Sequence, residues 1–394
     1  IRYAMTNIRI KYGRQEVTQD DIAAVVQVLN SELLTQGPVV PAFEKALCDY
    51  TGSNHSIAVN SATSALHIAC MALDLGPGDT LWTCPNTFVA SSNCAIYCGA
   101  MVDFVDMDPK TYNMDIDQLE SKLKKAKINN NLPKVLVPVH LSGQSCQMQE
   151  IHELSKEYGF KIIEDASHGI GGSYMHSKVG SCQFSDITVF SFHPVKIITT
   201  GEGGAALTNN SDLANKLVKL RSHGITADPA EMDTRPENEI WNYQQVCLGY
   251  NYRMTDIAAA LGLSQLKRVD LIIKKRNEIA SRYNQELADL PLHRPWQHPD
   301  TLSSYHLYII QLNLNKIKKT QPEIYDELRN SGILVNLHYI PVYRQPFYES
   351  MGFEAGYCPE SEAYHQRALS IPMYSTLSLD DQNYVIETLK KVII

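Results

Sequence analysis

A lysine that follows a predicted strand is the first residue placed to do chemistry. Lys196 ends the run Phe-Ser-Phe-His-Pro-Val-Lys, and Gly201, Gly203 and Gly204 follow shortly after it. Glycines permit a tight loop and a close approach of the backbone. A partly desolvated lysine can have a lowered pKa and form a Schiff base with a carbonyl group. Taken alone, however, the segment favours a surface lysine in a turn, because most lysines are exposed.

An acidic residue follows a second predicted strand. Residues 160–163 form that strand, and Glu164, Asp165 and His168 come directly after it. A carboxylate at the end of a buried strand needs a partner, because burying an unpaired charge is costly. A pyridinium nitrogen would be such a partner, and Asp165 would keep the ring protonated as an electron sink. Capping of the next helix or turn by Asp165 explains the pattern equally well.

Small and hydroxylic residues mark a possible anion site. Residues 60–65 read Asn-Ser-Ala-Thr-Ser-Ala, so that Ala62 and Thr63 lie between a predicted strand and a helix. Backbone N–H groups and hydroxyls at a helix N-terminus form a cradle for phosphate. An ordinary N-cap is nevertheless the more frequent role of such a string. Phe88 could stack on a flat ring or belong to the core, and Ser191 could bind a phosphate or phenolate oxygen.

In combination these weak signals indicate one kind of site. Their order along the chain is a phosphate cradle, a stacking ring, an acid at a strand end and then a lysine. A pyridoxal-phosphate enzyme with the aspartate-aminotransferase fold requires that order. Other readily recognised motifs are missing, among them GxGxxG after the first strand, GxxxxGK[ST], HExxH and GxSxG.

The elements that must position these residues alternate between strands and helices over the first two-thirds of the chain. Such alternation is typical of a mostly parallel α/β sheet, which binds ligands beyond the carboxyl ends of its strands. A first helix should open at Thr18, with an apolar face made by Ile22, Val25, Val26 and Leu29. We predict strands at residues 57–59, 80–83, 101–105, 135–139, 160–163 and 187–191, and further helices at 65–73, 89–97, 116–125 and 147–158.

A second, smaller α+β domain is predicted after residue 265. We therefore divide the chain into a large domain over residues 1–265, which would hold the cofactor, and a small domain over residues 266–394. The pattern in this second part predicts one long helix at 257–290, strands at 305–314 and 334–337, and helices at 322–329 and 380–392.

Composition excludes two classes of partner. The chain has 394 residues, with 35 lysines and arginines against 43 aspartates and glutamates, for a net charge of −8. A general nucleic-acid binder carries a basic excess. The apolar runs are far shorter than a membrane span, and residues 1–10 lack the apolar core of a secretory signal. We expect neither a nucleic-acid nor a membrane partner.

The cysteines indicate a reducing environment. There are nine, at irregular spacing and without a CxxC pair. In a chain of this size such thiols are typical of small buried side chains in the cytosol. We therefore expect a cytoplasmic protein with no metal site and no disulfide.

Four longer strings resemble the DegT/StrS family of sugar aminotransferases over nearly the whole chain. They are NSATSAL (60–66), EDASHGIG (164–171), SFHPVK with TTGEGG (191–204), and GYNYRMTDIAAALGLSQL (249–266). The strings NSELLTQG, SFHPVK, RSHGI and HYIPVY are most similar to its pseudaminic-acid branch. That resemblance implies transfer of the amino group of L-glutamate to C4 of UDP-2-acetamido-2,6-dideoxy-β-L-arabino-hex-4-ulose. The products would be 2-oxoglutarate and UDP-4-amino-4,6-dideoxy-N-acetyl-β-L-altrosamine.

The resemblance also implies roles for individual residues. Lys196 would bind pyridoxal 5′-phosphate and shuttle protons, Asp165 would pair with the pyridine nitrogen, and His168 would lie at the phenolic side of the ring. Further cofactor contacts would come from Ala62, Thr63, Phe88, Ser191 and, from the neighbouring subunit of a homodimer, Asn251. Contacts with the sugar substrate would come from Tyr12, Glu32, Leu33, Leu34, Thr35, Ala62, Ser191, Asn251, Asn336, Leu337, His338 and Tyr339.

Other functions stay open at this point. A sister enzyme would aminate C4 or C3 of another nucleotide keto-sugar, such as a D-configured one of the legionaminic or bacillosamine type. A related subgroup of dehydratases has histidine in place of the lysine, which Lys196 argues against. A cofactor-binding regulatory module without catalysis would be expected to carry a fused DNA-binding segment, and the charge and layout of this chain show none.

Overall fold

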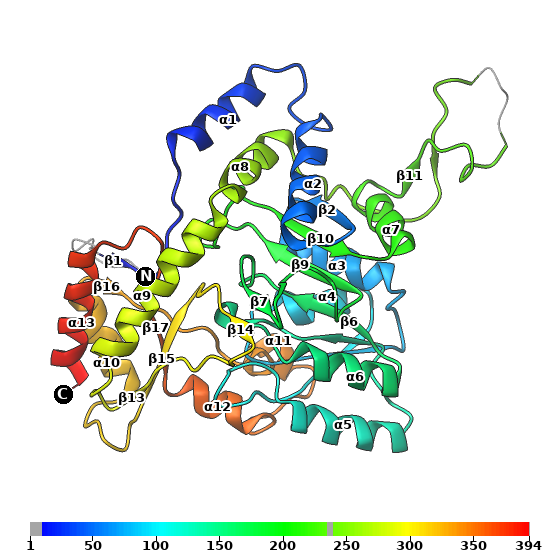
Figure 1. The fold of residues 1–394 in the computed structure, drawn as a ribbon. Helices are drawn as coiled ribbons and strands as arrows, with labels where there is room; N and C mark the ends of the chain where they lie inside the picture. Colours follow the sequence, from blue (N-terminus) through cyan, green and yellow to red (C-terminus); the bar gives the residue numbers. More distant parts are fainter. Residues whose placement is uncertain (1–9, 235–238, 394) are drawn as a thin grey trace.

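The computed structural model describes residues 10–234 and 239–393; most of the N-terminal segment considered above for a signal lies outside them. Within these ranges seven strands form the central sheet, in the order β2-β10-β9-β6-β5-β3-β4 (Figure 1). All pairs from β9 to β4 are parallel, whereas β10 runs antiparallel to both of its neighbours. The mostly parallel α/β sheet is therefore confirmed. The strands are β2 (His55–Val59), β3 (Thr80–Thr83), β4 (Met101–Phe104), β5 (Val135–Val137), β6 (Lys161–Asp165), β9 (Ile187–Ser191) and β10 (Gly204–Thr208).

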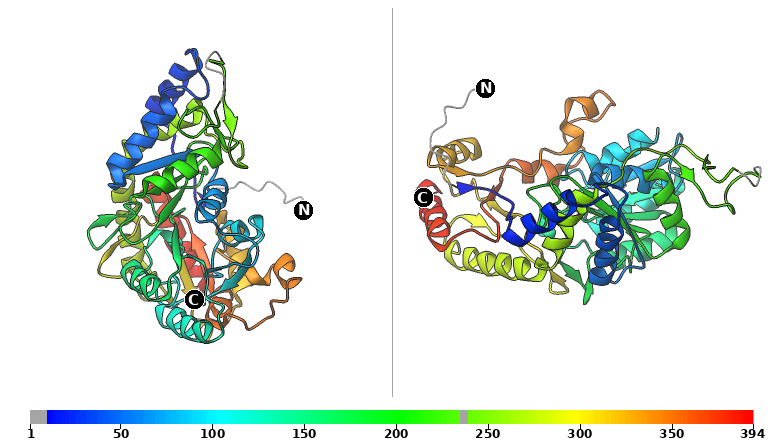
Figure 2. Two further views of the ribbon diagram at one scale, coloured as in Figure 1. Left: turned by 90° about the vertical axis from the view of Figure 1, so that its right-hand side faces the viewer. Right: turned by 90° about the horizontal axis from the view of Figure 1, so that it is seen from above.

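Helices cover both faces of the sheet because its strands are apolar on both sides. On one face, Val135, Val137 and Ile163 pack into a core with α3, α4 and α7. On the other face, Leu136 and Ile162 pack with α5 and α6, and a neighbouring core joins α2, α8 and α9 to β9 and β10 (Figure 2). The helices are α2 (Val39–Thr51), α3 (Ala62–Ala72), α4 (Ala90–Tyr97), α5 (Ile116–Ile128), α6 (Met148–Tyr158), α7 (Ser211–Arg221), α8 (Asp256–Leu266) and α9 (Val269–Glu286).

The C-terminal part packs around a small antiparallel sheet, as expected for an α+β unit. Its order is β13-β15-β17, and a separate apolar core joins it to the C-terminal half of α9 and to α10 and α13. The N-terminal strand β1 (Ile10–Lys11) reaches this part and pairs with β16. A division near residue 265 remains our proposal. The elements are β13 (Leu292–His293), β15 (Tyr308–Leu312), β16 (Ile333–Leu334), β17 (Ala368–Ile371), α10 (Gln321–Asn330), α11 (Pro346–Glu349), α12 (Pro359–His365) and α13 (Leu379–Ile393).

Short pairings complete the fold. A three-stranded sheet has the order β14-β7-β8, and a hairpin joins β11 to β12. Short 3-10 turns, η1 and η2, precede α6 and α11. These elements are β7 (Ser173–Tyr174), β8 (Ser177–Lys178), β11 (Ile225–Thr226), β12 (Gln244–Gln245), β14 (Thr301–Leu302), η1 (Leu141–Gly143) and η2 (Val342–Arg344).

The prediction of one helix over 257–290 is wrong. The helix breaks between α8 and α9 at Lys267 and Arg268, where Arg268 leaves the helical region with ψ near 2°. The guanidinium of Arg268 donates at 2.7 Å to Asp21, a buried carboxylate in the first helix. Hydrophobic periodicity continues across the break, so the sequence pattern does not show where one helix ends and the next begins.

The predicted apolar face of the first helix is exposed in a single chain. Helix α1 (Gln19–Leu29) begins at Thr18 with a capping box, as expected, but it packs on α8 through Asp21 and Val28. Ile22, Val26 and Leu29 are roughly half exposed. Hydrogen bonds from Ser264 and Arg268 to Asp21 fix the rotation of α1 about its axis. In this orientation the apolar stripe of α1, formed by Ile22, Val26 and Leu29, is left uncovered.

Candidate active site

A cavity of about 630 Å³ opens at the carboxyl ends of the central strands. Strands β6 and β9 end there with Asp165 and Ser191, β2 leads into α3, and β10 begins there, so that residues distant in sequence meet at one edge of the sheet. Glu202, from the glycine-rich turn, lines the cavity without having been predicted. Twelve of the predicted site residues line it: Tyr12, Ala62, Thr63, Phe88, Asp165, His168, Ser191, Lys196, Asn336, Leu337, His338 and Tyr339.

Lys196 lies in a turn just beyond β9. Its backbone N–H donates to the carbonyl of His193 at 2.9 Å, which closes the turn and directs the chain back toward the sheet. Burial lowers the pKa of the Lys196 amine, the nearby Asp165 carboxylate raises it, and the result is a pKa of about 8. With this pKa about a tenth of the amine is neutral, and therefore nucleophilic, at pH 7, far more than for an ordinary lysine.

This pKa predicts how the cofactor-free protein reacts with an aldehyde. Because only the neutral amine attacks, the rate at which Lys196 captures pyridoxal phosphate should rise about tenfold per pH unit below pH 8 and level off above it. An ordinary lysine, with a pKa near 10.4, would go on gaining rate to pH 10. Stopped-flow absorbance between pH 6 and 10 measures the profile. A rate still rising steeply at pH 9.5 would contradict the lowered pKa.

Asp165 is held in place by neighbours on both of its oxygens. Its side chain accepts a hydrogen bond from the hydroxyl of Ser91 at 2.6 Å and another from the backbone N–H of Ser167 at 3.1 Å. Ser91 in turn bonds to the hydroxyl of Thr87 at 2.7 Å. Both donors stabilise the ionised carboxylate. Asp165 is therefore oriented as an anion at the cavity wall.

His168 is neutral, with its proton on a defined nitrogen. The backbone N–H of Ser142 donates to Nδ1 at 3.3 Å, so the proton of the neutral ring is on Nε2, which lies 3.4 Å from the hydroxyl of Tyr339. Burial, together with the charges of Lys196 and His338, lowers the pKa of His168 well below its ordinary value. His168 thus offers a fixed N–H donor at the cavity.

The predicted phosphate cradle has the geometry of a helix N-terminus. The hydroxyl of Ser61 caps α3 by accepting the N–H of Ser64 at 3.1 Å, while Ala62 and Thr63 occupy the first turn. The first N–H groups of a helix have no partner within it. Gly204 of β10 packs directly on this turn: a Cβ there would lie 2.6 Å from the backbone nitrogen of Ala62. The glycine therefore allows the sheet and the cradle to meet.

Aromatic and polar side chains form the rest of the cavity wall. Phe88 is 59% exposed, and its ring centroid lies 6.4 Å from that of Tyr339. His338 donates or accepts at 2.8 Å with the hydroxyl of Ser370, and its other nitrogen lies 3.4 Å from the amide of Asn336. The ring of Tyr12 lies 5.1 Å from that of His338. Phe88 is thus free to stack on a flat ligand.

Five predicted residues do not line this cavity in a single chain. Glu32, Leu33, Leu34 and Thr35 are exposed where the segment after α1 meets the start of α8, and Thr35 forms a bridge with Thr255. Asn251 is exposed as well and pairs with Ser222. Their contacts with cofactor or sugar therefore require a second copy of the chain and stay a prediction.

Two important residues escaped the sequence analysis. Ser91, which is fully buried beside Asp165, is the second residue of α4. His306 lines the cavity with its ring centroid 4.3 Å from that of His168, and its Nδ1 has no partner among the described residues. A histidine near the start of a predicted strand, in Ser-Ser-Tyr-His, was a weak signal for the second.

The residues present fit pyridoxal 5′-phosphate. Lys196 suits its aldehyde, the N–H groups at the start of α3 suit its phosphate, and Phe88 offers a face for its ring. Asp165, an anion bonded only to neutral donors, suits a protonated pyridine nitrogen. In the described ranges, no three histidine, cysteine or acidic side chains gather to hold a metal ion. Fold and site thus define a pyridoxal-phosphate-dependent enzyme of the aspartate-aminotransferase fold.

Comparison with known proteins agrees with this class. Residues 15–390 match the model of the DegT/DnrJ/EryC1/StrS aminotransferase family, and the chain belongs to that family. A relative from Campylobacter jejuni, UDP-4-amino-4,6-dideoxy-N-acetyl-β-L-altrosamine transaminase, is 39% identical over 385 residues, which cover 98% of this chain and 97% of the relative.

Solved structures give the same result. Helicobacter pylori PseC, an aminotransferase involved in the biosynthesis of pseudoaminic acid, superposes with a TM-score of 0.88 at 32% identity, over 98% of this chain and 99% of that one. Spr1654 from Streptococcus pneumoniae, solved in a PLP form, gives 0.86 at 30% identity over 98% of both chains. None of the helices that the structure describes is both long and apolar enough to cross a membrane.

Proposed function

We propose that this protein transfers the amino group of L-glutamate to C4 of UDP-2-acetamido-2,6-dideoxy-β-L-arabino-hex-4-ulose. The observation that carries the proposal is that two groups line one cavity. Lys196 has a lowered pKa, which makes its amine available as a nucleophile, and Asp165 accepts two hydrogen bonds that hold it as an anion. The C. jejuni relative, named for the altrosamine product, and PseC support this sugar over other keto-sugars. The products would be UDP-4-amino-4,6-dideoxy-N-acetyl-β-L-altrosamine and 2-oxoglutarate.

The residues divide the work of proton transfer. Bound pyridoxal phosphate supplies an electron sink and carries the amino group between the two substrates. Lys196 Nζ removes a proton from Cα of glutamate and delivers one to C4 of the sugar in the second half-reaction. Asp165 holds a proton on the ring nitrogen. His168 would offer its Nε2–H to the phenolic oxygen of the ring, and the first turn of α3 would hold the phosphate.

A second copy of the chain would complete the site. Lys196 is the one lysine or arginine among the described residues that line the cavity, whereas a UDP-sugar carries a negatively charged pyrophosphate. Asn251 and residues 32–35 are exposed, and the apolar stripe of α1 is uncovered in a single chain. We propose a homodimer that buries this stripe and brings Asn251 to the partner's cavity. Sedimentation analysis of the wild-type protein and of Val26→Glu would test it, with monomer expected for the variant.

The choice of substrate is tested by absorption spectroscopy. The purified protein is loaded with pyridoxal phosphate, and L-glutamate should then bleach its visible band. Each UDP-4-keto sugar epimer is added separately, and only the L-arabino sugar should restore the band. Restoration by a D-configured sugar would assign the protein to another nucleotide-sugar aminotransferase. A band that glutamate leaves unchanged would favour a cofactor-binding module without catalysis.

A further inference from the structure

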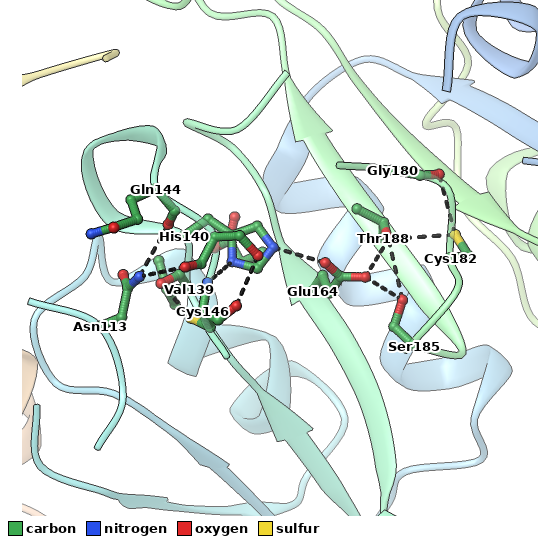
Figure 3. A network of polar contacts seen from close by, with 12 residues as sticks. Asn113, Val139, His140, Gln144, Cys146, Glu164, Gly180, Cys182, Ser185 and Thr188 are labelled. Carbon is green, nitrogen blue, oxygen red and sulfur yellow. Dashed lines mark hydrogen bonds and ion pairs between the residues drawn. The ribbon is translucent and has the colours of Figure 1, made fainter. Parts of the chain in front are cut away.

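A second carboxylate lies directly behind the site. Glu164 precedes Asp165 on β6, and because side chains alternate along a strand it points to the opposite face of the sheet. Its carboxylate is buried and accepts three hydrogen bonds (Figure 3): from the ring of His140 at 2.8 Å, the hydroxyl of Ser185 at 2.5 Å and that of Thr188 at 3.0 Å. The mechanism proposed above does not use this group.

The direction of the hydrogen bonds shows which groups are charged. The backbone N–H of Cys146 donates to Nδ1 of His140 at 3.1 Å, so Nδ1 has no proton and His140 is a neutral ring that donates through Nε2. The thiol of Cys182 donates a hydrogen bond to the hydroxyl of Thr188, which in turn donates one to Glu164. His140, Ser185 and Thr188 all donate to its oxygens, and these hydrogen bonds stabilise the ionised carboxylate against the cost of burial. Glu164 is thus a buried anion whose three donors are neutral.

The same network fixes the backbone around Asp165. The N–H of His140 donates to the carbonyl of Asp165 at 3.1 Å, and the N–H of Asp165 donates to the carbonyl of Pro138 at 2.9 Å. His140 therefore contacts two consecutive residues of β6, one through its ring and one through its backbone. Two residues further, Ser142 donates to His168. The segment that begins at His140 thus holds both polar residues predicted to contact the cofactor ring.

We propose that His140 and Glu164 are positioning residues for Asp165, and that the buried negative charge of Glu164 stabilises the proton on the ring nitrogen of the cofactor. The inference rests on the proposed function, since it needs the cofactor in this cavity. Two anions on successive residues of one buried strand favour a cation at the cavity wall, because the protein interior screens charge far less than water does. Removing the charge of Glu164 should therefore lower the proton affinity of the ring nitrogen that pairs with Asp165.

Few other titratable groups face these two carboxylates. Around Glu164 they are His140, Cys146 and Cys182. Around Asp165 they are Lys196 and Tyr339, with the neutral His168 beside them. The thiols of Cys146 and Cys182 are buried, and burial raises their pKa values, so both stay uncharged near neutral pH.

The test measures the proton on the ring nitrogen directly. Pyridoxamine phosphate labelled with ¹⁵N at the ring is bound to the wild-type protein and to Glu164→Gln, and its nitrogen chemical shift is followed with pH. We expect the midpoint for loss of the proton to fall by about one pH unit in Glu164→Gln, which is a tenfold loss of proton affinity. Thr83→Val is the matched control, because Thr83 donates a buried hydrogen bond to Val137 in the same sheet without touching Glu164.

Each outcome decides the proposal. A midpoint in Glu164→Gln equal to that of the wild type and of Thr83→Val would overturn it, even if all variants lost stability. If Glu164→Gln gives no folded protein, the double variant Ser185→Ala and Thr188→Val leaves Glu164 with one of its three donors. A buried carboxyl with so few donors favours its protonated, uncharged form, so the midpoint should shift in the same direction. No shift there would overturn the proposal too. A wild-type protein that fails to bind pyridoxamine phosphate would instead contradict the proposed function.

Discussion

Replacement of Lys196 by alanine should abolish turnover and leave cofactor binding largely intact. The amine is the group placed to move the proton at the reacting carbon, and positioned proton transfer contributes about 10² to 10⁴ in rate. Lys196→Ala also removes the covalent link to the cofactor, so we expect a loss of at least about a thousandfold. The cradle at α3, Phe88 and Asp165 remain. Pyridoxamine phosphate should therefore still bind, as equilibrium dialysis would measure.

Two comparisons separate chemistry from folding in this experiment. Lys124→Ala removes a lysine of α5 that is exposed and paired with Glu120, and its turnover should stay within about twofold of the wild type. Adding methylamine to Lys196→Ala should restore part of the rate, because a small amine can enter the cavity and carry the proton. Full turnover by a clean Lys196→Ala preparation would show that another group does this work.

The central sheet could be predicted wherever a strand is an apolar run between turn signals. Strands β3 and β9 begin and end at the predicted residues. Strand β10 was missed because its sequence, Gly-Ala-Ala-Leu-Thr, has little strand propensity of its own. It is a strand because β2 and β9 flank it with hydrogen bonds, and because small side chains fit under α3. Such a strand is determined by its neighbours.

The site could be predicted as far as its residues mark strand ends and helix starts. Asp165 is the last residue of β6 and Lys196 lies in the turn after β9, so their positions at one edge of the sheet follow from topology. Ser91 also lies at a helix start, but its place beside Asp165 does not follow from the sequence, and neither does the place of His306. Ser91 bonds to Asp165 across 74 positions of sequence, and His306 reaches the cavity from the C-terminal part. Their roles depend on packing between distant segments, which periodicity does not report.

Asparagine in place of Asp165 should cost nearly as much turnover as the loss of the lysine. Asparagine has the same shape and keeps a carbonyl oxygen for the N–H of Ser167, but it has no charge to hold a proton on the ring nitrogen. The cofactor then becomes a weaker electron sink, and the half-reaction with glutamate should slow by about 10² to 10⁴. Single-turnover absorbance with glutamate measures that step apart from product release. An Asp165→Asn rate within tenfold of the wild type would contradict this role.

Ser91 offers an internal check on how Asp165 acts. Its hydroxyl donates to Asp165 at 2.6 Å, so Ser91→Ala should slow the glutamate half-reaction several-fold by leaving the carboxylate less firmly oriented. If that is its whole effect, Ser91→Ala should cost almost nothing more once Asp165 is already asparagine, because residues that act as a unit are not additive. Equal losses from Ser91→Ala in both backgrounds would mean that the serine acts on its own. The double-mutant cycle thus distinguishes orientation of the carboxylate from an independent effect of the serine on α4.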